Sequence, residues 1–186
     1  MIRYSEFIDR IFRSSELLKT LIPSGSLAWN LPGEIGKADD ATLLGGKKVK
    51  DAKIVNLIRG GVLYAVDAIH EAHNFFQEVP GDLGSYWHGM MHRREGDFDN
   101  ARYWYRRAGK LPFFSSLHSA SCTHSPTMAR QENWDAYLLT GLCEQAKFGA
   151  VELNGECVHL QQIEFEGTFD YCWRQAVVLE ATPRSE

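Results

Sequence analysis

Apolar side chains recur every three or four residues along most of the chain, which is the spacing of one face of an α-helix. The strongest such stripe lies within 51–77, and it predicts one long helix over that range. It consists of Ile54, Ile58, Val62, Ala65, Ile69, Ala72 and Phe76. Similar patterns predict further helices at 5–22, 85–95, 99–108, 134–146 and 165–177.

These segments predict an all-α fold, with residues 1–186 forming a single compact domain of about five or six helices. The stretch 24–50 breaks every helical period with repeated glycine, so we expect a long irregular loop there. Residues 181–186 read as a frayed tail. The dipeptide Asn154-Gly155 favours either a β-hairpin at 149–160 or a helix boundary, and the sequence leaves both open.

The composition argues against two classes of partner. The chain has 20 Lys and Arg against 24 Asp and Glu, a net charge of −4, so a general affinity for nucleic acid is not expected. No run approaches the roughly eighteen apolar residues of a membrane helix, and the charged first twenty residues do not resemble a signal peptide. We therefore expect a cytoplasmic protein without membrane contact. Its four cysteines form no C-x-x-C pair, which favours reduced, buried thiols.

A helical hairpin is predicted where two short helical patterns flank Gly96. The segment 85–112 resembles one tetratricopeptide-type repeat, and this resemblance implies two antiparallel helices in close contact. The matching positions are Gly89, Ala101, Tyr105 and Ala108. The chain departs from the repeat at His88 and His92, where the pattern has leucine and tyrosine. The resemblance occurs once, whereas a solenoid needs about three stacked copies.

The longer run GSYWHGMMHRREGDFDNARYWYRRAG, preceded by DAIHEAHNFFQ, is similar to the signature of an uncharacterised family of bacterial and fungal proteins. That resemblance implies a single all-helical domain. It implies no particular chemistry, cofactor or substrate.

Histidines four residues apart share one face of a helix, so His88 and His92 could bind one metal ion. His70 or Glu71 from the preceding helix would supply further ligands for a divalent metal. The metalloprotease motif is absent because Gly89 stands where its glutamate would be. Two hydrogen-bonded histidines in a helix seam, without metal, are the alternative interpretation, and no cofactor is predicted.

A metal-free pocket is the leading hypothesis for the site. It would lie between the 51–77 and 85–95 helices, and it would join carboxylates to imidazoles for acid/base chemistry or ligand binding. The candidate residues are Asp67, Glu71, His73, His88 and His92. Arg93 and Arg94 are the candidate contacts to an anionic group of the ligand. A purely structural network of the same residues is the alternative.

The segment 93–110 has six basic and three acidic residues, a local charge of +3. Its Arg102, Tyr103, Arg106 and Arg107 share one helix face, which is typical of a solvated surface. Binding of a single strand of nucleic acid by these residues is the less favoured interpretation. In the last predicted helix, four polar residues read as its solvent side. They are Gln161, Gln162, Glu164 and Glu166.

The function that these patterns favour is binding of a small molecule in a polar pocket, and they leave open whether the protein is an enzyme. The alternative is a protein-interaction module that uses the repeat-like hairpin. A homo-oligomer or a protein partner is compatible with either function. No substrate or reaction class follows from the sequence.

Overall fold

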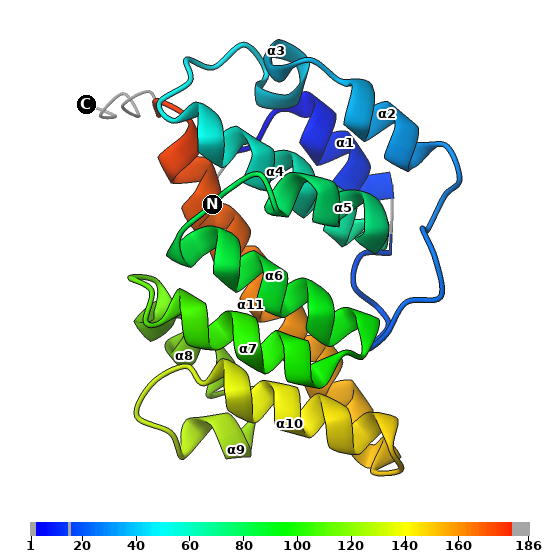
Figure 1. Cartoon of the computed structure of the whole chain (residues 1–186), viewed down its shortest axis with the longest axis vertical. Coiled ribbons are helices and arrows are strands. Elements are labelled where there is room, and N and C mark those ends of the chain that lie inside the picture. The colour runs from blue at the N-terminus through cyan, green and yellow to red at the C-terminus, as the bar shows by residue number, and fades with distance from the viewer. Residues whose placement is uncertain (1–2, 15, 180–186) are drawn as a thin grey trace, which may run out of the picture.

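The fold is all-α, as predicted, in a computed structural model that describes residues 3–14 and 16–179 (Figure 1). Within those residues the helices outnumber the five or six predicted, and the extended structure is an isolated bridge between Val49 and Val177. The elements are α1 (Glu6–Ser14), α2 (Leu31–Lys37), α3 (Asp40–Leu44), α4 (Ala52–Ala65), α5 (Ile69–Phe76), α6 (Asp82–Glu95), α7 (Phe98–Ala108), α8 (Phe114–Ser121), α9 (Pro126–Ala129), α10 (Ala136–Lys147), the 3₁₀ turn η1 (Val151–Leu153) and α11 (Asn154–Ala176). No helix in the described ranges is long and apolar enough to cross a membrane.

Helix α11 organises the arrangement. It runs behind the other helices in Figure 1 and contacts α4, α8 and α10. Helices α6, α7 and α10 lie side by side in front of it, while α1 to α5 occupy the other half of the molecule. Because α11 packs against both halves, its side chains contribute to one continuous apolar core.

The predicted helix over 51–77 is wrong as a single element, because it breaks into α4 and α5. Asp67 in the connecting turn has a φ of +63°, a left-handed conformation that interrupts a helix. Its Oδ1 accepts a hydrogen bond of 2.6 Å from Nη2 of Arg94. The apolar stripe is compatible with a straight helix, so its period could not reveal a break that a distant arginine stabilises.

Two other predicted boundaries need correction. The 24–50 loop contains α2 and α3, and Arg59 holds this segment by donating to the carbonyls of Ile35 and Ala38. The helix predicted over 5–22 ends at Ser14. Ser5 caps its start, its Oγ accepting from the backbone N–H of Ile8. The predicted tail 181–186 lies outside the described residues.

The segment around Asn154-Gly155 forms a helix start and no hairpin, with η1 leading directly into α11. The serine- and histidine-rich stretch after 112, which reads as a loop, contains α8. All four cysteines are free, and all but Cys122 are buried, which agrees with the prediction of unpaired thiols.

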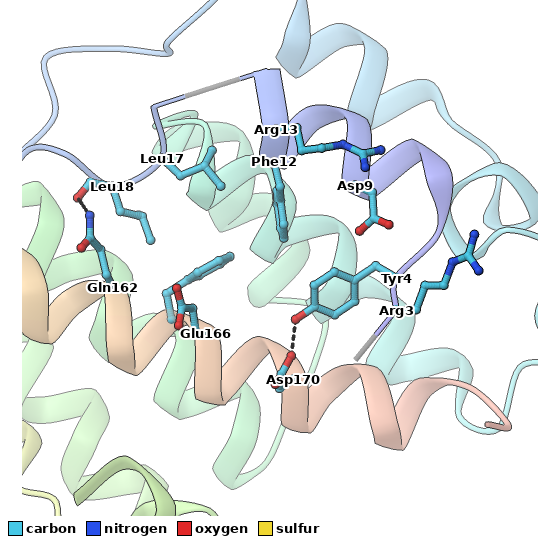
Figure 2. A pocket seen from close by; sticks show the side chains of 11 residues that line it. Arg3, Tyr4, Asp9, Phe12, Arg13, Leu17, Leu18, Gln162, Glu166 and Asp170 are labelled. Atoms are coloured by element: carbon cyan, nitrogen blue, oxygen red, sulfur yellow. Dashed lines mark hydrogen bonds between the residues drawn. The ribbon is translucent and has the colours of Figure 1, made fainter. Parts of the chain in front are cut away.

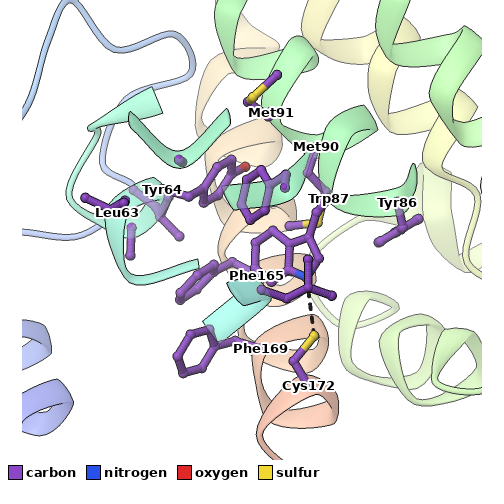
Figure 3. Packing of buried hydrophobic residues seen from close by; sticks show 14 of the residues in the cluster. Leu63, Tyr64, Tyr86, Trp87, Met90, Met91, Phe165, Phe169 and Cys172 are labelled. Carbon is purple, nitrogen blue, oxygen red and sulfur yellow. Dashed lines mark hydrogen bonds between the residues drawn. The ribbon is translucent and has the colours of Figure 1, made fainter. Parts of the chain in front are cut away.

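Trp87 lies at the centre of the apolar core (Figure 3). Its ring stacks on Phe76 with 5.0 Å between centroids, and its indole N–H donates to the Cys172 sulfur at 3.3 Å. Gly61 of α4 makes this packing feasible. A β-carbon there would lie 2.8 Å from the Phe169 ring, so only glycine allows α4 to approach α11 this closely.

The α6–α7 hairpin has the close contact that the repeat-like pattern implies. A β-carbon on Gly89 would lie 2.5 Å from the Tyr105 ring, so Gly89 sets the distance between the two helices. Gly96 ends α6 in a left-handed conformation, and Asp97 caps α7 by accepting from the N–H of Asn100. The hairpin is therefore fixed by its own local sequence.

Arg93 and Arg94 are adjacent on α6 and are both fully buried. Arg93 pairs with Glu164 of α11 and also donates to the Tyr105 hydroxyl at 2.7 Å. Burial acts to lower the pKa of Arg93, but Glu164, Tyr105 and other neighbouring groups together outweigh it and the pKa is raised. Glu164, expected on the solvent side of its helix, is thus the counter-charge of a core cation.

We predict that Glu164→Gln lowers the free energy of unfolding by about 3–5 kcal/mol, because it leaves the Arg93 charge buried without a partner. Glu34→Gln, which breaks the exposed Arg10–Glu34 pair, is the matched control and should cost about 0–1 kcal/mol. Urea denaturation of both variants measures the difference. A double Arg93→Met/Glu164→Gln variant should recover part of the loss, and equal costs for the two single variants would contradict this assignment.

Candidate functional site

Three histidines that the sequence singled out come together between α5 and α6. The ring centroid of His73 lies 5.3 Å from that of His88 and 5.7 Å from that of His92, and the last two are 6.3 Å apart. His88 and His92 are buried and His73 is half-buried. We call these three residues the histidine cluster.

Each buried histidine is held in one orientation. His88 donates from Nδ1 to the carbonyl of Gly84 at 3.0 Å, and its ring stacks on Trp104 with 4.1 Å between centroids. His92 donates from Nδ1 to Glu95 at 2.8 Å, so its Nε2 is the acceptor for the Asn100 amide at 3.2 Å. These bonds fix the orientation of both rings.

The cluster disfavours protonation. Burial lowers the pKa of His73, and the neighbouring His92 lowers it further, against an opposing effect of Glu95. Burial also lowers the pKa of His88, with a smaller opposing contribution from its bond to Gly84. Both effects act against protonation of His73 and His88.

The other predicted site residues have different surroundings. Asp67 is buried against Arg94, while His70 and Glu71 are exposed. Arg93 and Arg94 are paired in the core, so neither is available for an anionic ligand. Within the described ranges, no three His, Cys, Asp or Glu side chains are arranged to hold a metal ion. Of the five predicted pocket residues, the structure therefore brings together His73, His88 and His92.

A cavity of about 900 Å³ lies instead between α1 and α11 (Figure 2). We call it the α1–α11 cavity. Its apolar wall consists of Phe12, Leu17, Leu18 and Phe165. Its polar wall consists of Tyr4, Asp9, Gln162, Glu166 and Asp170, with Arg3 and Arg13 at the edge.

Carboxylates from both helices face this cavity. Glu166 and Asp170 lie one turn apart on α11, and the Tyr4 hydroxyl donates to Asp170 (Figure 2). Burial raises the pKa of Glu166, and the Asp170 charge raises it further. Burial likewise raises the pKa of Tyr4, and its hydrogen bond to Asp170 adds to the effect. The cavity thus concentrates negative charge beside apolar surface.

Sequence reasoning missed this cavity because its walls are more than 140 residues apart in the chain. Glu166 is exposed on α11, as expected, and Tyr4 carries no motif. One usable signal was present: Glu166 and Asp170 have the spacing of a helix face and lie beside Phe165 and Phe169.

The two regions can support different chemistry. The histidine cluster does not line the α1–α11 cavity. The α1–α11 cavity has the volume of a small-molecule site and a few convergent polar groups on an apolar wall. It is therefore the stronger candidate for ligand binding.

We predict that the protein loses stability as the pH falls from about 7 through 6.5, the usual pKa of an unfolded histidine. The lowered pKa values of His73 and His88 mean that the unfolded chain takes up protons first, so unfolding is favoured on the acid side. Urea midpoints between pH 7.5 and 5.5 measure the loss. His73→Gln should reduce the loss, whereas His124→Gln, at an exposed histidine outside the cluster, should leave it unchanged. Equal pH dependence of the urea midpoint in the parent and both variants would contradict this prediction.

Comparison with protein-family models, curated proteins and solved structures finds no match to this chain. The resemblances of the 85–112 segment therefore stay predictions. What the protein does is inferred from its own geometry.

Proposed function

We propose that the protein binds a small organic molecule in the α1–α11 cavity, and that this ligand has a basic nitrogen and an apolar body. The main support for this proposal is that two carboxylates, Glu166 and Asp170, line the same cavity as the Phe12 and Phe165 rings. An ammonium group would be held by the acidic wall while the body of the ligand covers the rings.

The charge of the cavity favours a cation. Asp9, Glu166 and Asp170 contribute three carboxylates against two guanidinium groups at the edge. The raised pKa of Glu166 supports the same ligand class, because a nearby positive charge would relieve the repulsion between the two α11 carboxylates. An anionic ligand would add to that repulsion.

The Tyr4 hydroxyl is suited to positioning and not to acid/base catalysis. Tyr4 is the donor that fixes Asp170, and its pKa is raised, so it keeps its proton at neutral pH. A general base needs a pKa near the working pH. The pKa of the Tyr4 hydroxyl is shifted upward, farther from neutral pH. Its role in the proposed site is to orient a carboxylate.

A protein-interaction module is the second candidate, and it rests on a different surface. Phe148 and Val151, at the junction of α10 and η1, are 74 % and 75 % exposed. Apolar side chains of this size are usually covered when they form part of an interface. If this surface mediates self-association, light scattering should show an oligomer that Phe148→Ser converts to monomer, and a monomeric parent protein would exclude that form of the module.

We predict that phenethylamine binds the protein and that phenethyl alcohol, which lacks the charge, binds at least several-fold more weakly. Glu166→Gln should lower the affinity for phenethylamine about 10-fold, because it removes one charged acceptor. The affinity for phenethyl alcohol should be the same in Glu166→Gln as in the parent protein. Isothermal titration calorimetry measures both ligands.

Glu78→Gln is the matched control, since Glu78 is an exposed glutamate outside the cavity. It should bind phenethylamine as the parent protein does. Equal affinity for the amine and the alcohol, or equal losses in the two glutamine variants, would refute the proposed site.

A further inference from the structure

A second cavity, of about 250 Å³, lies between α6, α7, α8 and α10. Five aromatic side chains line it, and each comes from a different element or connection. They are Tyr86, Tyr105, Phe114, Trp134 and Tyr137. We call this cavity the aromatic pocket. None of these residues lines the α1–α11 cavity, so the two sites are independent.

The rings of the aromatic pocket are inclined to one another. Tyr86 lies 5.3 Å from Tyr105 with 55° between planes, and 5.3 Å from Phe114 with 51°. Tyr105 lies 6.2 Å from Tyr137 with 59° between planes. None of these three pairs is stacked face to face.

The polar atoms of the buried rings are already used. The Trp134 N–H donates to the Tyr86 hydroxyl at 2.7 Å, which in turn donates to Glu164 at 2.7 Å. The Tyr105 hydroxyl accepts from Arg93. A ligand in the pocket therefore meets the carbon surfaces of these rings, whose π faces carry negative potential.

The edge of the pocket provides one fixed carboxylate. Both backbone bonds that cap α10 fall on Oδ1 of Asp135, from the N–H groups of Tyr137 and Leu138. Its Oδ2 is left for a ligand. The basic residue at the edge, Lys110, is exposed and on a flexible stem, so its ammonium can stay in water.

We propose that the aromatic pocket binds a methylated ammonium group. Such a cation needs no hydrogen-bond acceptor, which suits a wall whose hydroxyl and indole groups are engaged. It is attracted by several ring faces at once, which is how quaternary ammonium ions are bound in aromatic cages. The small volume favours a free small molecule of this class.

The test compares choline with 3,3-dimethylbutan-1-ol, which has the same shape without the charge, by calorimetry on the full chain. We expect choline to bind and the neutral alcohol to bind at least several-fold more weakly. Equal binding of the two, or no binding of choline, would overturn the proposal.

Variants then locate the site. Tyr137→Ala should lower the affinity for choline about 3- to 30-fold. Tyr137→Phe should retain the affinity because it keeps the ring. Tyr137 is 42 % exposed, so its loss should leave the fold intact. Tyr103→Ala is the matched control, as Tyr103 is 48 % exposed on α7 and outside the pocket. A loss that is equal in Tyr137→Ala and Tyr103→Ala would refute the assignment.

A further variant separates the two sites. Glu166→Gln, in the α1–α11 cavity, should leave choline binding unchanged if the cation occupies the aromatic pocket. Loss of choline binding in this variant and not in Tyr137→Ala would place the cation in the α1–α11 cavity and overturn the second site. A peptide with trimethyllysine serves as the other source of the same group. Tighter binding of the peptide than of choline would overturn the assignment to a free small molecule.

Discussion

The ion pair between Arg93 and Glu164 is out of reach of water, and the way α6 meets α11 depends on it. Burying two charges is costly, so the pair is tolerated only where further hydrogen bonds satisfy the remaining polar atoms. Tyr86, Tyr105 and Gln161 provide those bonds. Because these partners come from three helices, only one relative placement of the helices satisfies all of them.

The helical segments and several of their ends could be predicted from interactions between residues that are close in the sequence. The stripe of apolar residues in α4 and α5, the Ser5 and Asp97 caps and the stop at Gly96 all act within a few residues of where they occur. The break at Asp67 did not follow, because its partner Arg94 lies 27 residues away. Local patterns therefore predict which segments are helical better than they predict where a long segment bends.

The same distinction divides the candidate sites. The histidine cluster was predictable because His88 and His92 are one turn apart and His73 lies on the preceding helix. The α1–α11 cavity was not, since it forms only when Tyr4 reaches Asp170 from the other end of the chain. Arg93 and Arg94 follow a histidine pair in the sequence and were predicted to contact an anion. In the structure they form ion pairs with Glu164 and Asp67 in the core. A charged residue in sequence has no assigned role until its partner is known.

The left-handed turn at Asp67 has an evolutionary consequence. Glycine would adopt that backbone conformation with less strain, but it would leave the Arg94 guanidinium in the core without its counter-charge. Natural selection can therefore exchange the aspartate only together with the arginine, and the same holds for Glu164 and Arg93. In homologous chains, a substitution at position 67 should therefore be accompanied by one at position 94.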